Sequence, residues 1–297
     1  MTGSTAPPRA RLYGLILLMT LLWAMNFVIG KVALREFPAL LAGSMRTALA
    51  GVLVAPLYWW DSRRRSLPRW SRADLPRLLF LGLVGVALNQ LFFLIGLGRT
   101  SVAHSAFLLA ITPVLVLLLS AAFGHERISA RKLAGMGVCI AGVLVLQVTG
   151  GEAGGVTVAG DLLTLLAAVF FSLFAVVGKG AATRHGPLTV SAFAYIGGGL
   201  MLAPVLVWES RRFAFAAVSA AAWASMVYMA VFPSLVCYLI YLYALKHLSP
   251  SRLSAFSYLQ PLLASLLAIA VLAEPLTGSV LTGGALVLAG VFVAERG

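Results

Sequence analysis

A few amide side chains interrupt long apolar stretches of this sequence, and each has an aromatic residue nearby. Trp23 lies three residues before Asn26, and Phe93 lies four residues after Asn89. Residues at these spacings share one face of a helix. Such a face offers hydrogen bonds beside an apolar surface, which suits binding of a small amphiphilic solute. The alternative is that these amides only make hydrogen bonds between packed helices.

Other candidate binding residues lie in further apolar stretches: His104, Tyr238, Tyr241 and Tyr258. His104 stands near the start of its stretch, where it either binds a substrate carboxylate or is a solvated or hydrogen-bonded residue. The three tyrosines either line a path or pack in the core. Gln90 points about 100° away from Asn89 on a helix, which favours a role in helix–helix hydrogen bonds.

Motifs for covalent or metal chemistry are absent from the sequence. It contains no HExxH, GxSxG, P-loop or CxxC motif and no cluster of His and Asp residues. Ser105 follows His104 directly, but adjacent helical residues point about 100° apart, which is poor geometry for a nucleophile and its base. The sequence therefore predicts no catalytic residue, no metal site and no cofactor, and the protein is not expected to be an enzyme.

The composition indicates the class of protein in which these side chains are held. Of the 297 residues, 61% are hydrophobic and 10% are charged, and the mean hydropathy is +0.99. Soluble domains carry about 25% charged residues, so a soluble enzyme, a disordered chain and a disulfide scaffold are excluded. Cys139 and Cys237 stand in apolar stretches and are interpreted as small buried hydrophobes.

A bilayer core of about 30 Å needs about 20 apolar residues in one helix. Stretches of this kind recur along the whole chain, so we expect an all-α polytopic membrane protein with ten transmembrane helices. The expected spans are 12–34, 39–60, 77–97, 103–123, 132–149, 159–180, 187–208, 222–245, 252–273 and 278–294.

The sequence repeats itself at an offset of 148 residues. Matching pairs in this register include Gly30 with Gly178, Lys31 with Lys179, Gly51 with Gly199, Pro56 with Pro204, Pro113 with Pro261, Glu126 with Glu274, and Gly142 with Gly290. We expect two repeats, 1–148 and 149–297, of five spans each. Because five is odd, the second repeat must be inverted in the membrane. Inverted repeats are typical of secondary transporters, which bind substrate near the midplane between the repeats.

Prolines inside the predicted spans are candidate hinges. Pro113, Pro233 and Pro261 each remove a helical hydrogen bond and kink the chain. The matching positions of Pro113 and Pro261 favour a role in shaping gates in both repeats, and a static kink is the alternative.

Charged residues are scarce inside the predicted spans. Arg46 lies about 10 Å deep at a rise of 1.5 Å per residue, from where it either snorkels to water or anchors a substrate carboxylate. Asp161 and the paired residues Glu126 and Glu274 all lie at span ends. Proton-coupled carriers often use buried carboxylates, so the sequence favours a facilitator or exchanger.

Small residues and helix caps mark the fifth and tenth spans. Gly137 with Ala141, copied by Ala285 with Ala289, form small-xxx-small pairs that either pack these two spans together or make a dimer face. Ser129 and Thr277 are expected to cap the same two spans, and Glu126 and Glu274 before them are interpreted as structural.

The net charge of +13 is attributed to loops that face anionic lipid, so no nucleic acid is expected as a partner. The distribution of Lys and Arg between the two sides predicts that both termini lie in the cytoplasm. The expected location is the bacterial inner (plasma) membrane. The expected partners are membrane lipid and a small-molecule substrate, and the oligomeric state is left open.

The stretch Trp23-Ala-Met-Asn26-Phe-x-x-Gly30-Lys31 resembles the first-span motif of the drug/metabolite transporter superfamily, EamA type. The run from Pro113 to Gly142 and its copy from Pro261 to Gly290 resemble the same family. The chain is most similar to the YddG-type amino-acid exporters, which implies export of amino acids.

The second repeat departs from the pattern, because Phe171 and Phe174 replace Trp23 and Asn26, so we expect the site to be weighted toward the first repeat. The function expected is secondary transport that exports small metabolites, above all aromatic or neutral amino acids, by alternating access through a central cavity. The alternatives are transport of drugs or nucleosides on the same fold, or a membrane scaffold that transports nothing.

Overall fold

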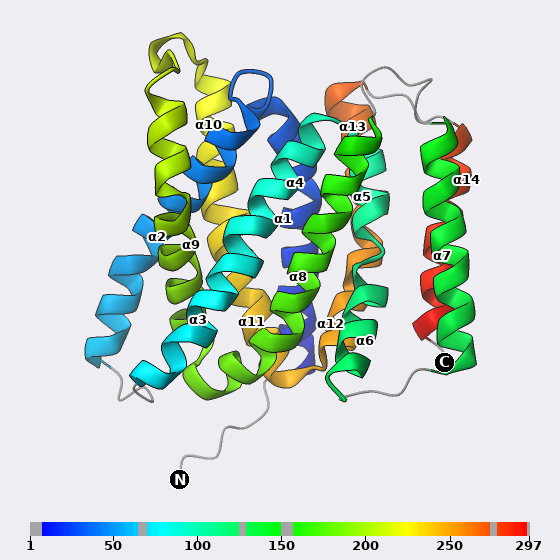
Figure 1. The fold of residues 1–297 in the computed structure, drawn as a ribbon, viewed down its shortest axis with the longest axis horizontal. Coiled ribbons are helices and arrows are strands. Elements are labelled where there is room, and N and C mark those ends of the chain that lie inside the picture. The colour runs from blue at the N-terminus through cyan, green and yellow to red at the C-terminus, as the bar shows by residue number, and fades with distance from the viewer. Residues whose placement is uncertain (1–7, 65–69, 125–128, 150–156, 274–277, 296–297) are drawn as a thin grey trace.

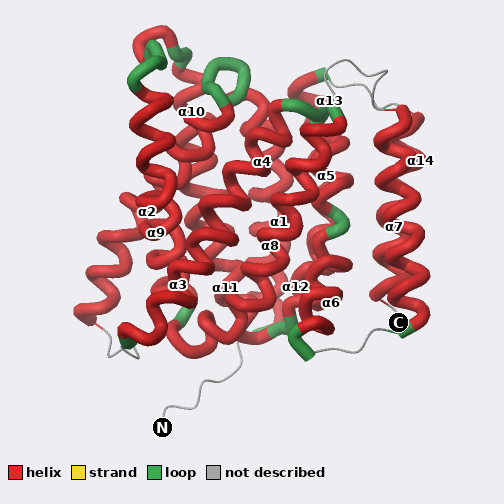
Figure 2. The backbone as a smooth tube through the Cα atoms, in the orientation of Figure 1, coloured by secondary structure: helices red, strands yellow, loops and turns green. Residues whose placement is uncertain are grey.

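The computed structural model describes residues 8–64, 70–124, 129–149, 157–273 and 278–295. Within these ranges every regular element is helical (Figure 2). The α-helices are α1 Arg9–Ala33, α2 Ala39–Arg64, α3 Leu75–Gly82, α4 Asn89–Gly98, α5 Val102–Leu109, α6 Thr112–Ala122, α7 Ala130–Thr149, α8 Val158–His185, α9 Pro187–Ser210, α10 Ala220–Met229, α11 Cys237–His247, α12 Pro250–Ser254, α13 Leu259–Leu272 and α14 Gly278–Glu295.

Eight stretches of the described chain are long and apolar enough to cross a membrane, by length and composition. They are Arg9–Ala33, Ala39–Arg64, Arg72–Gly98, Val102–Ala122, Val158–His185, Pro187–Ser210, Ala220–His247 and Pro250–Leu272. Their ends lie within a few residues of eight of the predicted spans. Helices α7 and α14 occupy the other two predicted ranges, and the apolar part of α14 is shorter, Val280–Gly290.

Four of these stretches are not continuous α-helix, which the sequence reasoning did not predict. The stretch that contains α3 and α4 includes a π-helical segment, Leu83–Leu88, and the stretch that contains α10 and α11 includes another, Ala230–Val236. The α-helix is also interrupted between α5 and α6, and a short 3₁₀ segment, Ala255–Tyr258, separates α12 from α13. Each kind of irregularity falls at the same position in both repeats.

Contacts between the repeats are reciprocal. A Cβ on Gly51 of α2 would lie 3.0 Å from the Tyr195 carbonyl oxygen of α9, and one on Gly199 of α9 would lie 3.7 Å from the Thr47 carbonyl oxygen of α2. Gly199 and Tyr195 are the repeat counterparts of Gly51 and Thr47. Gly51 therefore packs against Tyr195, and the equivalent glycine, Gly199, packs against the residue equivalent to Tyr195, which is Thr47.

Helices α7 and α14 pack against each other and stand beside the other helices (Figure 1). Their contact is reciprocal too, because Gly142 meets the backbone of Val287 and Gly290 meets the backbone of Cys139. The predicted pair Gly137 and Ala141 is wrong as a packing motif between these helices, since both residues are exposed.

Ser129 accepts a hydrogen bond from the Lys132 amide at 3.3 Å, as expected for a cap of α7. Glu126, Glu274 and Thr277 lie outside the described residues.

Large apolar side chains cover the outer surface of the helices. Leu200 is 70% exposed and Val52 is 69% exposed. An apolar surface of this extent suits contact with lipid. Cys139 and Cys237 are both free and buried, in agreement with their interpretation as small hydrophobes.

Candidate functional site: a cavity shared by the two repeats

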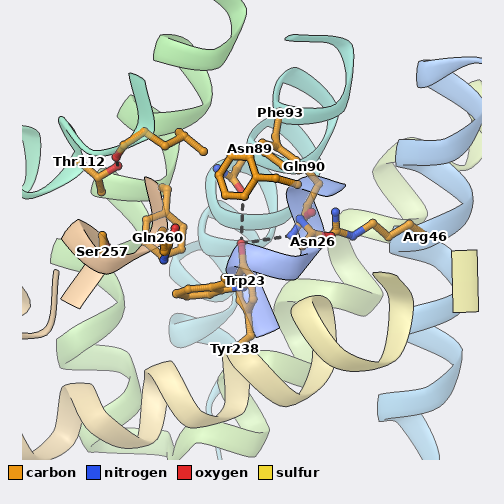
Figure 3. A pocket seen from close by; sticks show the side chains of 13 residues that line it. Trp23, Asn26, Arg46, Asn89, Gln90, Phe93, Thr112, Tyr238, Ser257 and Gln260 are labelled. Atoms are coloured by element: carbon orange, nitrogen blue, oxygen red, sulfur yellow. Dashed lines mark hydrogen bonds between the residues drawn. The ribbon is translucent and has the colours of Figure 1, made fainter. Parts of the chain in front are cut away.

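A cavity that is partly open to solvent lies between the helices, with about 590 Å³ of empty space when the solvent at its mouth is included (Figure 3). Its described lining consists of Trp23, Asn26, Phe27, Arg46, Asn89, Gln90, Phe93, Leu109, Thr112, Phe171, Tyr238, Ser257 and Gln260. The predicted binding residues Trp23, Asn26, Asn89, Phe93 and Tyr238 are all in this set. Side chains from both repeats thus meet around one space.

The lining contains pairs of residues at equivalent positions of the two repeats. These pairs are Trp23 with Phe171, Gln90 with Tyr238, Leu109 with Ser257, and Thr112 with Gln260. Gln90 Nε2 even donates a hydrogen bond to its counterpart, Tyr238 Oη, at 3.4 Å. The cavity therefore lies where equivalent positions of the two repeats face each other.

The other lining residues all belong to the first repeat: Asn26, Phe27, Arg46, Asn89 and Phe93. Their counterparts in the second repeat are outside the described lining. The described lining of the cavity is therefore weighted toward the first repeat.

The π-helical segment before Asn89 sets the position of this amide. The Asn89 N–H bonds the Val86 carbonyl, whereas a regular α-helix would direct it to Gly85. The Gly85 carbonyl instead accepts a hydrogen bond from the Tyr238 hydroxyl of the other repeat. Asn89 Nδ2 donates to the Ala167 carbonyl at 2.8 Å, which fixes the amide against α8. π-Helical turns often occur at functional sites.

The second π-helical segment also leaves a carbonyl that accepts a hydrogen bond from the other repeat. The Cys237 N–H bonds the Phe232 carbonyl, so the Pro233 carbonyl lacks its α-helical donor. The Trp23 indole N–H donates to that carbonyl at 3.1 Å. Pro233 was predicted to be a hinge, and it lies within this π-helical segment.

The other two prolines that were predicted to be hinges lie next to interruptions of the helices. Pro113 is in the first turn of α6, just after the non-helical residues 110–111. Pro261 lies near the start of α13, just after the segment Ala255–Tyr258. The residue before each of these prolines, Thr112 or Gln260, lines the cavity.

One wall of the cavity is a cluster of aromatic rings. Trp23 packs edge-on against Phe171, with ring centroids 5.6 Å apart. Tyr241 lies behind them, with its ring 5.7 Å from Trp23 and 5.1 Å from Phe171, and it is outside the described cavity lining. On another side Phe27 packs edge-on against Phe93 at 5.4 Å. These rings give the cavity a firm apolar boundary.

Gln90 lines the cavity, although its helical phase favoured a purely structural role. It does make structural contacts as well, since its amide nitrogen lies 3.3 Å from the Tyr195 hydroxyl. A cavity enclosed by several helices can meet more than one face of each helix, so a turn of about 100° from Asn89 does not exclude Gln90.

Arg46 is the only charged residue among the described residues that line the cavity. Its side chain does not snorkel to water, because the residue is 1% exposed. Packing of α2 against α9 and against the segment Ala230–Val236 covers it. Its Nε donates to Ser234 Oγ at 2.8 Å.

His104 and Tyr258 lie away from the described cavity lining. His104 Nδ1 is 3.0 Å from a carboxylate oxygen of Asp161, and both side chains are buried. The Thr100 hydroxyl donates to the same carboxylate at 2.7 Å. Tyr258 packs against an apolar cluster of α5, α7 and α14. Asp161 is near the start of α8, as expected, but it is a buried carboxylate.

Sequence reasoning missed several lining residues: Phe27, Leu109, Thr112, Phe171, Ser257 and Gln260. The sequence contained a signal for three of them, Phe171, Thr112 and Gln260. Phe171 is the repeat counterpart of Trp23. Thr112 and Gln260 are polar residues that directly precede Pro113 and Pro261 in otherwise apolar spans.

Comparison with known proteins identifies related chains along almost the full length. The chain is 28% identical to an uncharacterized transporter of Archaeoglobus fulgidus, over 92% of this chain and 95% of that protein. It is 32% identical to a probable terminal-alkyne amino-acid exporter of Streptantibioticus cattleyicolor, over 95% of this chain and 92% of that protein. An uncharacterized inner membrane transporter of Escherichia coli, YedA, is 26% identical over 86% of this chain and 81% of its own length.

One solved crystal structure shares the fold, with a TM-score of 0.69, 20% identity, and coverage of 97% of this chain and 98% of that chain. The EamA-like transporter family matches twice, over residues 11–148 and 158–295, so both repeats carry the family pattern. Its relatives are transporters and not enzymes. Two family matches that together span the helices around the shared cavity show that this multi-pass membrane protein belongs to the EamA-like transporter family.

Proposed function

We propose that this protein is a secondary transporter that exports small metabolites, above all neutral or aromatic amino acids, by alternating access through the central cavity. The observation that carries the proposal is the lining of the cavity by equivalent residues of the two repeats. Secondary transporters with inverted repeats bind substrate at such an interface and expose it to either side by exchanging the conformations of the repeats.

The proposed topology is ten membrane helices in two inverted repeats, 1–148 and 149–297. The reciprocal glycine contacts support a two-fold relation between the repeats. In Figure 1, α1 begins at the lower end of the molecule and α8, its counterpart, begins at the upper end. This opposite direction supports inversion, and α7 and α14 complete the two sets of five.

The proposed substrate class follows from the lining. Trp23, Phe93 and Phe171 offer apolar contact, and Asn26 and Asn89 offer hydrogen bonds. The name of the Streptantibioticus relative, a probable terminal-alkyne amino-acid exporter, points the same way. Cationic drugs are disfavoured, because the positive charge of Arg46 repels them and the described lining has no carboxylate.

The proposed location is a bacterial inner membrane with both termini in the cytoplasm. Helix α1 begins and α14 ends at the same end of the molecule (Figure 1). The last turn of α2 carries Arg63 and Arg64, and Arg131 and Lys132 stand in the first turn of α7 at that same end. An excess of positive residues on one side is typical of the cytoplasmic face.

Counterflow in proteoliposomes tests the proposed function. Purified protein would be reconstituted into vesicles loaded with unlabelled L-phenylalanine, L-leucine or L-propargylglycine, an amino acid with a terminal alkyne. Uptake of the same compound in labelled form would then be measured. We expect saturable exchange of several neutral amino acids, which protein-free vesicles lack.

The site variant is Asn26→Ala and the matched control is Thr20→Ala. Both residues are buried polar residues of α1, but only Asn26 lines the cavity, and Thr20 bonds the Ile16 carbonyl within its own helix. Exchange should fall in Asn26→Ala and persist in Thr20→Ala. If folded wild-type protein exchanges nucleosides but no amino acid, the amino-acid proposal is wrong. If it exchanges no solute of either class, both of these substrate classes are excluded.

A further inference from the structure

Arg46 is a buried cation that lacks an acidic partner among the described residues. Its Nη1 atom is buried and has no hydrogen-bond partner there, and Ser234 Oγ holds its Nε. The neighbouring polar groups are neutral and belong to Tyr195, Tyr228, Cys237 and Tyr238. Removing a charge from water is costly unless an opposite charge or hydrogen bonds compensate. The guanidinium is therefore ready to accept an anion from the cavity.

The fold fixes the direction of this guanidinium. Pro233 has no N–H, so the Met229 carbonyl lacks its usual helical donor. The Ser234 hydroxyl donates to the Met229 carbonyl at 2.7 Å, which leaves Ser234 Oγ free to accept from Arg46 Nε. One edge of the guanidinium is thus used to position it, and Nη1 remains for a ligand.

Asn26 supplies a complementary orphan group. Its Oδ1 atom is buried and has no hydrogen-bond partner within the described chain, and the residue is 5% exposed. In Figure 3 the Arg46 side chain reaches from α2 toward Asn26 and Gln90, and Thr112, Ser257 and Gln260 lie on the other side of the cavity. An unpaired donor with a positive charge and an unpaired acceptor therefore lie on the same side.

We propose that Arg46 and Asn26 form a zwitterion site, in which Arg46 Nη1 binds the carboxylate of the substrate and Asn26 Oδ1 accepts a hydrogen bond from its ammonium group. This proposal rests on the proposed function and narrows it to substrates with a free carboxylate. The sequence left two interpretations of Arg46 open, snorkelling to water or anchoring a substrate carboxylate. The burial of the residue and its unpaired Nη1 atom support the second.

The remaining walls suit the rest of such a substrate. Trp23, Phe93 and Phe171 provide apolar surface for an uncharged side chain. A second positive or negative charge on the substrate side chain has no described partner of opposite sign in the lining other than Arg46 itself. The site is therefore expected to select amino acids with uncharged side chains over amino acids with charged side chains.

Three ligands test the site on the wild-type protein without any variant. L-phenylalanine carries both groups, L-phenylalaninamide lacks the carboxylate, and 3-phenylpropionate lacks the ammonium. Binding would be measured in detergent by competition with labelled L-phenylalanine. A charge-assisted hydrogen bond that is lost reduces affinity by about tenfold to a hundredfold, so we expect the amide to bind at least about tenfold more weakly, and 3-phenylpropionate to bind more weakly than L-phenylalanine.

Variants then assign the carboxylate to Arg46. Arg46→Gln should abolish the preference for L-phenylalanine over its amide, and Arg46→Lys should restore only part of it, because lysine keeps the charge but not the fork geometry. Arg77→Gln is the matched control, since Arg77 is exposed and donates to the Val177 carbonyl away from the cavity lining. Thermal unfolding would verify folding, and Arg46→Gln should unfold no earlier than wild type because it removes an unpaired buried charge.

The outcomes separate this proposal from the proposed function. If wild-type protein binds L-phenylalanine and its amide equally, the zwitterion site is wrong and amino-acid transport stands. If Arg46→Gln is folded and keeps the full preference for the acid, Arg46 is not the carboxylate ligand. If wild-type protein neither binds nor exchanges any amino acid tested, the proposed function fails and the zwitterion site fails with it.

Discussion

Gly85 and Pro233 occupy the same position in the two repeats, and the backbone carbonyl of each accepts a hydrogen bond from an aromatic side chain of the other repeat. Tyr238 donates to Gly85, and Trp23 donates to Pro233. Both carbonyls lack their α-helical donor because each lies in a π-helical segment. The same local irregularity in each repeat thus provides a hydrogen bond that joins it to the other repeat.

We expect Tyr238→Phe to lower the free energy of unfolding by about 1–3 kcal/mol, because it removes the hydroxyl that donates a hydrogen bond from one repeat to the buried Gly85 carbonyl of the other. Tyr241→Phe is the matched control, since the Tyr241 hydroxyl has no hydrogen-bond partner in the described structure. Its removal should change stability little or increase it. Denaturation of both variants in the same detergent measures the difference, and equal losses would contradict the importance of this bond.

Gly290→Ala should destabilise the pair of helices α7 and α14. A Cβ at this position would lie 2.5 Å from the Cys139 amide nitrogen, and backbone atoms cannot move aside easily. Overpacking of this kind costs about 1–3 kcal/mol. Gly137→Ala on α7 is the control, because a Cβ there meets nothing within 4 Å. Thermal unfolding of the two variants should separate them clearly, and a neutral Gly290→Ala would show that the contact is loose.

The loop between α1 and α2 is bound to the start of α10 through Glu36. Hydrogen bonds from the Ser219 hydroxyl and amide lower the pKa of the Glu36 carboxyl below its ordinary value of 4.5. A lowered pKa in the folded state means that this contribution to stability is complete above the ordinary pKa. It is lost as the pH falls through the lowered pKa of the folded protein.

Glu36→Gln should therefore reduce stability at neutral pH and flatten the acid side of the stability profile. Thermal unfolding of both proteins between pH 3 and 7 (a range chosen to extend about one unit or more on either side of the ordinary Glu pKa) measures the difference. Profiles of wild type and variant that stay parallel over the whole range would show that Glu36 does not contribute in this way.

Exchange should not be driven by a pH gradient. The described lining of the cavity contains neither a carboxylate nor a histidine, so it has no group to carry a proton with the substrate. The buried pair of His104 and Asp161 lies outside that lining and is held by Thr100. Uptake into vesicles with and without an imposed gradient, at a clamped membrane potential, tests this. A steep acceleration would contradict the exchanger hypothesis, and Asp161→Asn would then show whether this pair is responsible.

The sequence by itself determined the helical class, the positions of the helices and the repeat. A bilayer requires long apolar helices, so the spans could be found from composition with ends within a few residues. The cost of burying polar groups in hydrocarbon also made Asn26 and Asn89 conspicuous, and both line the cavity. The family match over both repeats agrees with the motifs around Trp23 and Pro113.

Only the tertiary structure decided which side chains share the cavity and which pair elsewhere. His104 resembled a site residue in the sequence, but Asp161, 57 residues away, binds it outside the cavity lining. Arg46 was near enough to a span end to reach water, yet packing of α9 and of the segment Ala230–Val236 against α2 buries it. The depth of a residue along a membrane helix follows from its position in the sequence. Its burial and its hydrogen-bond partners depend on which other helices pack around it, because those contacts join residues far apart in the sequence.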